Sequence, residues 1–540
     1  MACSKFFSGD LPELLNEVIQ YFHYDYKTLH SCILVNRLWC RLAIPLLWEN
    51  PFSIKFPKNY RFIEIYLHNL SDDVKTRLNE YKIHNGIFLS NTLFNYPKFI
   101  QCLDTHNVYN SIEIWASTIE EKHSNYSPSQ MSNFTNLIFR SLFLIFIENE
   151  VNLHSFKVMA DYEEYKCFDA AFELILQNPN FVHNIKDLTL DFDDDITDNV
   201  RKFIGFLCSN CNSISSLYFQ FTFTCQYYPT IEKKLSQMIK FQENLKKISF
   251  CYNYNPPLYL LLSSNCSNTL NTIIFHYIDF KNMNVLSEVF NQLNVLESIH
   301  IVYCSSLDSK FIQQIYNIIK PFKLKSLFLN HVDELLLEPL IQKSGNYLEN
   351  FGIDKCEFQQ LIQSLKLYCN NIKLLYLTIG RDYQNINLLL DLIKKLRQNL
   401  NYLIINSSYL TTNKNIEISQ IILQNLGQIL PFKLEYLNLD LAFTKGSDLE
   451  IFLKNSQNTY TNKLLIKNTK NFESQDILPY IKEYIVKKKR VKYLCILESL
   501  YRIDKDFYSF KDKAKEFQLH DIQVLNYKDF DIYDYIKEAY

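Results

Sequence analysis

A short pattern of apolar positions recurs along most of the chain: an apolar residue, two residues of any kind, an apolar residue, one residue of any kind and a third apolar residue. Ten clear copies begin at positions 185, 214, 245, 270, 296, 324, 348, 372, 400 and 434, so successive starts are 24 to 34 residues apart. Each copy alternates like a strand, and the segments between copies place apolar residues at helical spacing, as at Leu286, Val289 and Leu293. The pattern predicts a series of repeats that each contain one strand and one helix.

Weaker copies extend the series at both ends. They begin after it at Leu464, Val491 and Leu519, and before it at Tyr109 and Leu153. The period is typical of leucine-rich repeats, which bury their apolar faces by stacking on one another. We therefore expect an α/β fold in which residues 108–540 form an open leucine-rich-repeat solenoid, or horseshoe. The competing architecture, a closed (β/α)₈ barrel, has eight strand–helix repeats, fewer than this chain offers.

Several cysteines keep a fixed place in these repeats. Cys304 and Cys356 each lie eight residues after the start of their own copy, and Cys211 and Cys369 each lie three residues before the next start. Repetition at fixed offsets indicates small buried packing residues, and the offsets resemble those of the cysteine-containing class of leucine-rich repeats. Cys208 and Cys211 form a C-x-x-C without a second pair or a histidine at zinc spacing, so we interpret them as repeat cysteines too.

The first fifty residues do not carry the repeat pattern. From Asp10 to Trp48 the apolar residues fall at the spacing of three short helices. Asp10 can cap the first helix, Glu13 can reach back to the Asp10 backbone N–H, and Pro12 sits in the first turn, where a missing N–H costs nothing. About forty residues cannot close a core around so many large apolar groups. We expect these groups to be covered by the next part of the chain or by a second protein.

Three segments of this stretch carry a family resemblance: residues 11–15 (LPELL), 34–39 (LVNRLW) and 43–48 (AIPLLW). Their order and spacing resemble an F-box, the module that docks on a Skp-type adaptor of cullin–RING ubiquitin ligases. Asn36 stands where the commonest pattern has cysteine. The resemblance implies an F-box at residues 1–50, followed by a helical linker at 51–107. The alternative is a helical cap on the repeats.

The resemblance also implies partners and a role. The chain would be the substrate-recognition subunit of an SCF-type ligase, bound to a Skp-type adaptor and through it to a cullin, and would not itself be an enzyme. The residues expected to contact the adaptor are Leu11, Pro12, Leu14, Leu34, Val35, Trp39, Pro45 and Leu46. The alternatives are a leucine-rich-repeat scaffold or ligand sensor without a ligase role, and an unrecognised hydrolase.

The concave face of the horseshoe is the expected site for a target protein. Side chains alternate along a strand, so the residues between the apolar positions point away from the core. Aromatic side chains among polar ones are typical of binding hot spots. The expected target-binding residues are Tyr218, His300, Phe328, Asn330, Tyr376, Tyr402, Asn406 and Tyr436.

Composition excludes several other functions. The 56 basic and 58 acidic residues give a net charge of −2, so no global field attracts nucleic acid or an anionic membrane. The eight glycines form no phosphate-binding loop, and we expect no cofactor, no metal site and no catalytic group. The longest apolar run, residues 142–147, is far short of a membrane span, and the N-terminus is no secretory signal. We expect a soluble protein in the cytoplasm, the nucleus or both, with reduced cysteines.

Two charged runs have ordinary explanations. The acidic residues Asp191, Asp193, Asp194, Asp195 and Asp198 resemble a cation-binding loop, but Ile196 stands where an EF-type loop needs glycine, so we expect a solvated loop with an aspartate capping the next helix. The basic run 487–490 could bind phosphate or direct nuclear import. It also follows an expected helix at residues 477–486, whose C-terminus favours cations.

Overall fold

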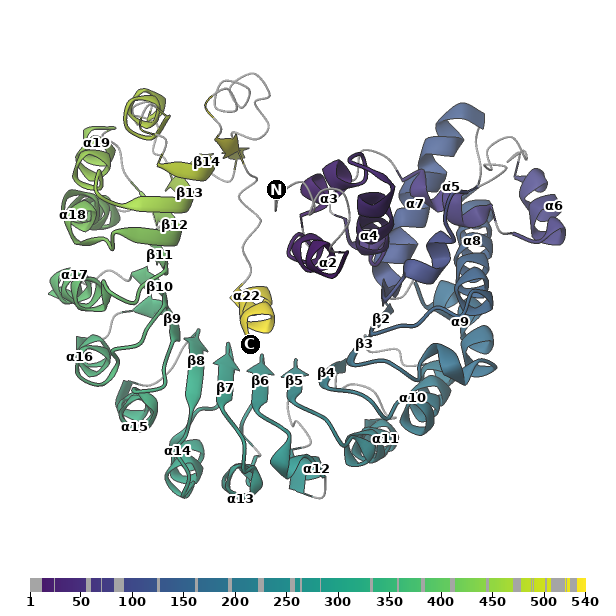
Figure 1. The fold of residues 1–540 in the computed structure, drawn as a ribbon. Coiled ribbons are helices and arrows are strands. Elements are labelled where there is room, and N and C mark those ends of the chain that lie inside the picture. The colour runs from purple at the N-terminus through teal and green to yellow at the C-terminus, as the bar shows by residue number, and fades with distance from the viewer. Residues whose placement is uncertain are drawn as a thin grey trace. The chain divides into compact units, whose positions relative to one another are not determined.

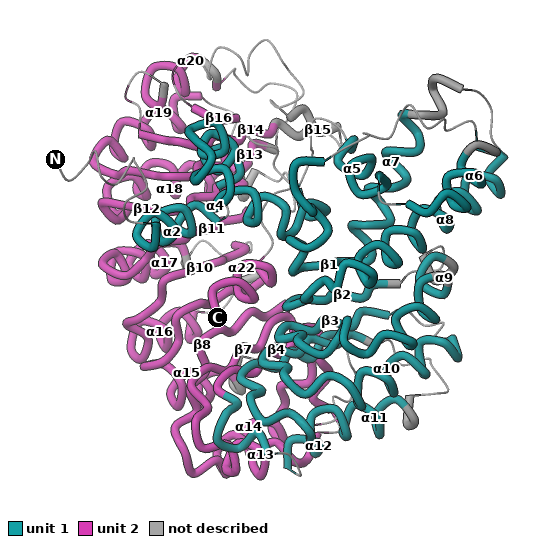
Figure 2. The backbone as a smooth tube through the Cα atoms, turned by 45° about the vertical axis from the view of Figure 1, so that its right-hand side comes forward, with its two compact units in different colours: residues 1–253, 259–270 teal, residues 254–258, 271–540 magenta. Residues whose placement is uncertain are grey.

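The computed structural model describes most of the chain in two compact units (Figure 2). Unit 1 comprises residues 1–253 and 259–270, and unit 2 comprises residues 254–258 and 271–540. The described residues are 12–540 except 24, 55–59, 69, 82–91, 124–126, 161–163, 193–196, 222–227, 253–257, 263–264, 282, 331–333, 357–358, 380–383, 408–412, 443–445, 470–476, 487, 489, 501–502, 507–519, 521 and 525–531.

Unit 1 begins with three helices where the sequence predicts them: α2 (Pro12–Gln20), α3 (Tyr26–Cys32) and α4 (Arg37–Leu47) (Figure 1). The Asp25 carboxylate caps α3 and the Asn36 side chain caps α4, each by accepting backbone N–H hydrogen bonds from the first turn. The expected cap of α2, Asp10, lies outside the described residues. We call residues 12–48 the N-terminal module. Its core consists of Leu15, Ile19, Leu29, Cys32, Trp39, Ala43 and Leu46.

Several shorter elements and two long helices connect the module to the first repeats: η1 (Pro51–Ser53), α5 (Phe62–Leu67), α6 (Asp72–Glu80), η3 (Tyr96–Phe99), β1 (Cys102–Asp104), α7 (Thr105–His123) and α8 (Pro128–Glu148). The expected strand beginning at Tyr109 is wrong, because this segment belongs to α7. Val108, Ile112 and Trp115 are buried at helical spacing, which so short a motif does not distinguish from a strand. The strand β1 lies just upstream, and its three residues are too few to show alternation.

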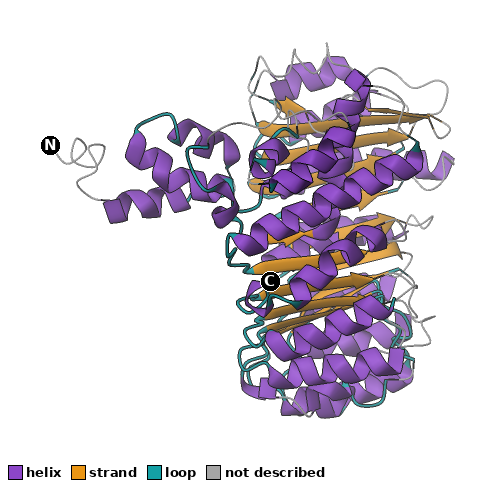
Figure 3. Cartoon of the chain, turned by 90° about the vertical axis from the view of Figure 1, so that its right-hand side faces the viewer, coloured by secondary structure: helices purple, strands orange, loops and turns teal. Residues whose placement is uncertain are grey.

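The sheet of unit 1 is parallel and keeps the order of the sequence through β1, β2 (Ser155–Ala160), β3 (Asp187–Phe192), β4 (Ser216–Phe221) and β5 (Lys247–Cys251). The helices α9 (Glu164–Leu176), α10 (Asp198–Asn210) and α11 (Tyr228–Phe241) alternate with the strands, and α12 (Tyr259–Leu262) and η5 (Asn265–Asn268) follow (Figure 3). The second apolar position of each copy is in register from β2 to β5, in a row made of Phe156, Leu188, Leu217 and Ile248.

Unit 2 continues the same alternation of strand and helix. Its parallel strands are β6 (Thr272–His276), β7 (Ser298–Val302), β8 (Leu324–Leu329), β9 (Asn350–Cys356), β10 (Leu374–Ile379), β11 (Tyr402–Asn406), β12 (Lys433–Leu441), β13 (Tyr460–Thr469) and β14 (Val491–Leu500). The helices between them are α13 (Leu286–Gln292), α14 (Ser309–Tyr316), α15 (Glu334–Ser344), α16 (Gln359–Tyr368), α17 (Gln384–Leu396), α18 (Asn413–Ile429), α19 (Gly446–Asn455) and α20 (Leu478–Ile481), which runs on into the π-helix η6 (Lys482–Val486).

The end of the unit 2 sheet is less regular. The strand β15 (Ile503–Asp506) pairs antiparallel with β14, and the two-residue strand β16 (Gln523–Val524) pairs parallel with it. Among the described strands of each unit, the first does not pair with the last, so each sheet is open. Stacked strand–helix repeats with open sheets agree with the expected solenoid and not with a closed barrel.

The cysteines that the repeat pattern singles out are packing residues, as predicted. Cys208, Cys211, Cys304 and Cys369 are buried. The Cys211 thiol donates to the Val182 carbonyl (3.2 Å) and the Cys208 thiol to the Lys234 carbonyl (3.0 Å), so each bonds to a neighbouring repeat. Burial raises the pKa of Cys211 and of Cys369 to about 12, which keeps these thiols protonated at neutral pH. The Cys356 side chain lies outside the described residues.

Close packing between neighbouring helices leaves no room for a side chain at one glycine. A Cβ on Gly427 in α18 would lie 2.7 Å from the Phe452 carbonyl oxygen in α19, and backbone cannot move aside cheaply. We expect Gly427→Ala to destabilise unit 2 by about 1–3 kcal/mol, read as a lower midpoint of thermal unfolding. Gly205→Ala in α10 is the matched control, because there the Cβ would meet only the flexible end of Lys234. An unchanged midpoint for Gly427→Ala would contradict the expectation.

Candidate functional site

The N-terminal module exposes several large apolar side chains beside its buried core. The apolar stripe of α2 is divided: Leu15 and Ile19 are buried in the core, whereas Leu14, Val18 and Tyr21 follow helical spacing on an exposed face. The turn between α3 and α4 adds Leu34 and Val35, whose side chains are 74% and 53% exposed. We call Leu14, Val18, Tyr21, Leu34 and Val35 the exposed apolar set. Large apolar side chains concentrated on so small a module indicate a protein-interaction surface.

The structure separates the residues expected to contact an adaptor into two groups. Pro12, Leu14, Leu34 and Val35 are exposed, and Pro45 is half-buried within α4. Trp39 and Leu46 are buried in the core of the module, only 9% and 7% exposed. Leu11 lies outside the described residues. Val18 and Tyr21 are also exposed, but they are not among the residues expected to contact an adaptor. Their helical spacing from Leu14 would have indicated that they share its face.

The module is joined to the rest of unit 1 through the end of α4. The Trp48 ring packs on Tyr96 and Tyr66, with centroids 4.2 and 5.6 Å apart. The Glu49 carboxylate lies 2.8 Å from His23 Nε2, and its backbone carbonyl accepts hydrogen bonds from Gln101 and Cys102. These contacts use the opposite end of α4 from Leu34 and Val35, which precede that helix. The exposed apolar set is therefore not needed to hold the module in unit 1.

A helix from the end of the sequence covers part of the unit 2 sheet. This helix, α22 (Ile532–Ala539), lies on the face opposite α13 to α17, which we call the inner face (Figure 1). The Tyr533 ring is stacked on His276 at 4.0 Å and 6° between planes. Tyr540 packs on His300 at 4.5 Å and Tyr535 on Tyr402 at 4.7 Å. The inner face is thus an observed docking surface for a helix.

A polar network fixes Tyr540. Its hydroxyl donates to the Glu349 carboxylate (2.8 Å) and accepts from the Asn350 side-chain amide (3.1 Å). Burial alone would raise the pKa of Glu349, but hydrogen bonds from Lys325, Lys373 and Tyr540 lower it to about 2. Burial, together with donation to Glu349, raises the pKa of Tyr540 well above its usual value. The site therefore pairs a carboxylate that stays ionised with a phenol that stays protonated.

The same network continues into the sheet. The Asn350 amide also donates to the Ser326 hydroxyl (2.8 Å), which lies 2.8 Å from His300 Nδ1. His300, Ser326 and Asn350 are in register on β7, β8 and β9. One row of polar side chains across three strands therefore lies beneath the Tyr540 end of α22.

The expected target-binding residues of unit 2 lie in or beside this surface, but they are less exposed than the sequence suggested. His300, Phe328 and Tyr436 are buried, and Tyr376, Tyr402, Asn330 and Asn406 are half-buried. The expectation of exposed aromatic rings is therefore wrong for these three residues. Tyr540 covers His300, and the Phe328 ring fills the space above Gly352. Tyr436 packs in a small cluster with Ile404, Leu465 and Cys495.

Two further expected residues have local partners. The Tyr376 hydroxyl donates to Asp354 (2.7 Å) on the neighbouring strand. Tyr218 belongs to β4 of unit 1, where it is buried and its hydroxyl donates to Gln220 (2.7 Å). Sequence reasoning missed α22 itself. The signal was the helical spacing of Ile532, Tyr533, Ile536 and Tyr540.

The described parts of the two charged runs show no second site. Asp193, Asp194 and Asp195 lie outside the described residues, and Thr197 rather than an aspartate caps α10. In the described part of the chain, no group of three or more His, Cys, Asp or Glu side chains is placed to hold a metal ion. The basic run follows a short helix as expected, since α20 and η6 end at Val486.

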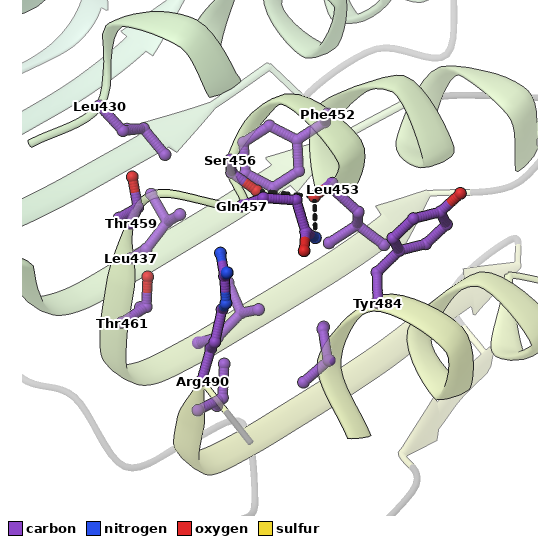
Figure 4. A pocket seen from close by; sticks show the side chains of 13 residues that line it. Leu430, Leu437, Phe452, Leu453, Ser456, Gln457, Thr459, Thr461, Tyr484 and Arg490 are labelled. Atoms are coloured by element: carbon purple, nitrogen blue, oxygen red, sulfur yellow. Dashed lines mark hydrogen bonds between the residues drawn. The ribbon is translucent and has the colours of Figure 1, made fainter. Parts of the chain in front are cut away.

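A small cavity beneath α19 holds a buried cationic atom. Thr459, Thr461 and Arg490 line it together with apolar residues of α19 and β12 (Figure 4). Nη1 of Arg490 is buried, and none of the described residues accepts a hydrogen bond from it. The cavity volume of about 30 Å³ has room for about one or two water molecules.

None of the described helices combines the length and the apolar character needed to cross a membrane. Neither models of protein families nor curated proteins give a match to this sequence.

Proposed function

We propose that the chain is the substrate-recognition subunit of a cullin–RING ubiquitin ligase, with the N-terminal module acting as an F-box and the repeats as leucine-rich repeats. The observation that carries this proposal is the exposed apolar set on the module. Leu14, Leu34 and Val35 belong to it, and the sequence resemblance assigns these same residues to an adaptor interface. Burying such side chains against a partner stabilises a complex by about 1.5–3 kcal/mol each.

In this role the chain performs no bond chemistry. The module holds the Skp-type adaptor, the solenoid holds the target, and other subunits of the ligase transfer ubiquitin. The chain accelerates the transfer by raising the effective concentration of a target lysine near the loaded enzyme. The inner face of unit 2 supports this role because it already accommodates a protein helix.

Co-expression with a Skp-type adaptor tests the proposal. We expect the full chain to co-purify with the adaptor in a stoichiometric complex that survives size-exclusion chromatography. A chain that elutes alone at micromolar concentration of both proteins would exclude the ligase role and favour a repeat scaffold without an adaptor.

A further inference from the structure

We propose that the inner face of unit 2, from β6 to β11, binds an amphipathic helix of the target protein, and that α22 occupies this surface as a competing ligand within the same chain. The proposal rests on the proposed function in one respect, because it takes the bound helix to belong to the recruited target. The bound helix would carry aliphatic and aromatic residues along one face and a tyrosine about two turns further on.

The contacts of α22 define the pattern that the surface recognises. Ile532, Tyr533, Ile536 and Tyr540 lie at positions i, i+1, i+4 and i+8, which share one face of a helix. Ile536 is fully buried, and Ile532 and Tyr533 are nearly so. Docking of a helix by such anchors is a common mode of peptide recognition.

The hydrogen bonds add selectivity at one end of the surface. Glu349 accepts from the Tyr540 hydroxyl while Lys325 and Lys373 hold the carboxylate ionised. A phenylalanine in place of Tyr540 would remove one of the three donors to this charged acceptor. The surface should therefore prefer tyrosine at this position of the ligand.

One row of apolar side chains in the unit 2 sheet packs without α22. Side chains alternate across each strand, so the row Leu327, Phe351, Leu375 and Leu403 faces the helices on the other side of the sheet. These four side chains are fully buried. Under α22 lie polar groups such as Ser326 and Asn350, which water can solvate when the helix leaves. The helix thus lies on the face of the sheet opposite to this apolar row, as a docked ligand would.

Two tyrosines lie at the rim of the surface. Tyr277 and Tyr303 follow β6 and β7 and adopt left-handed backbone conformations, with φ of 51° and 53°. Bulky residues rarely adopt such angles, and they do so mostly where function fixes them. The two rings are stacked at 5.5 Å beside His276, and Tyr277 is 41% exposed. A target helix longer than α22 can contact the exposed part of the Tyr277 ring and so outcompete α22.

Competition within one chain sets a threshold for the target. A helix as short as α22 is not stable alone in water, so it forms on the surface. Its tether gives it an effective concentration on the order of a millimolar. Only a target helix that binds more tightly than α22, or is itself held close, displaces it.

The test uses the full chain and a fluorescent synthetic peptide of residues 528–540 as the probe. Ile536→Asp places a charge in the buried face of α22 and should free the surface, whereas Ala539→Asp places the same charge on its exposed face and is the matched control. We expect the Ile536→Asp chain to bind the peptide at least tenfold more tightly than the unaltered chain or the control. Equal binding by all three chains, or binding by none, would overturn the proposal.

A second arm identifies the surface. In the Ile536→Asp chain, Glu349→Gln should weaken binding of the peptide severalfold, and a peptide with Tyr540→Phe should lose the same factor. The two changes together should cost no more than either alone, because they remove one interaction. Independent, additive losses would refute docking through Glu349.

Hydrogen exchange covers the case in which a variant folds poorly. Backbone amides of residues 533–539 should be protected in the unaltered chain and unprotected in the Ile536→Asp chain, while β6 to β11 stay protected in both. Unprotected amides in the unaltered chain would exclude the docked helix. Adaptor co-purification should be equal in both chains. Its absence alongside tight peptide binding would refute only the ligase role.

Discussion

Replacing Leu34 and Val35 together with aspartate is expected to abolish co-purification with a Skp-type adaptor while the chain stays folded. Both side chains are exposed in the turn before α4, and neither belongs to the core of the N-terminal module. Losing two buried apolar contacts costs about 3–6 kcal/mol, and burying two carboxylates without partners costs more. Affinity for the adaptor should therefore fall by more than about hundredfold, as measured by titration calorimetry.

The matched control is an equally exposed leucine elsewhere in the chain. Leu367 in α16 is 70% exposed, so Leu367→Asp introduces the same change in unit 2 without touching the module. Adaptor binding should be unaffected in this variant. Full adaptor binding by the Leu34 and Val35 double variant would remove the main support for an F-box in this chain.

The second large effect is expected for Trp39→Ala, and it acts through folding. Trp39 is buried in the small core of the module, and deleting a buried tryptophan side chain costs about 3–5 kcal/mol. Because so small a core gives a low free energy of unfolding, we expect α2 to α4 to unfold locally while the repeats stay folded. Amide exchange should show loss of protection in residues 12–47, and adaptor binding should be lost with it.

Amide hydrogen exchange distinguishes the loss of adaptor binding in Trp39→Ala from the loss in the Leu34 and Val35 double variant. The Leu34 and Val35 double variant should keep protection across α2 to α4 and lose only the adaptor. Tyr21→Ala serves as the control for removal of a ring, because Tyr21 is exposed on the same module. Normal amide protection in Trp39→Ala would mean that the module is stabilised by contacts beyond its own core.

The repeats could be predicted because each strand repeats one physical requirement. Leu327, Phe351 and Leu375 fill the same position of successive copies, and they are paired in register. The helices between strands followed from apolar spacing in the same way. Even Cys211 was assigned correctly, since a small residue at a fixed offset has one simple explanation, burial between repeats.

The docking surface of unit 2 could not be predicted in full, because it depends on contacts between distant segments. Alternation along β7 and β8 places His300 and Phe328 away from the helices, but it does not show what lies over them. The cover comes from Tyr540, 240 residues after His300 in the sequence, and from the absence of a side chain at Gly352. Local patterns carry no information on such pairings. For the same reason, periodicity alone did not separate Leu34 from Trp39 in the module.

The reactivity of two buried thiols can be used to measure transient local opening of the fold. Cys211 lies in unit 1 and Cys369 in unit 2, and both are sealed from solvent and protonated at neutral pH. A maleimide or disulfide reagent can reach either sulfur only during a transient opening of the surrounding repeats. The labelling rates of Cys211 and Cys369 therefore measure how often the repeats of unit 1 and of unit 2 open. Both cysteines are native, so no engineered probe is needed.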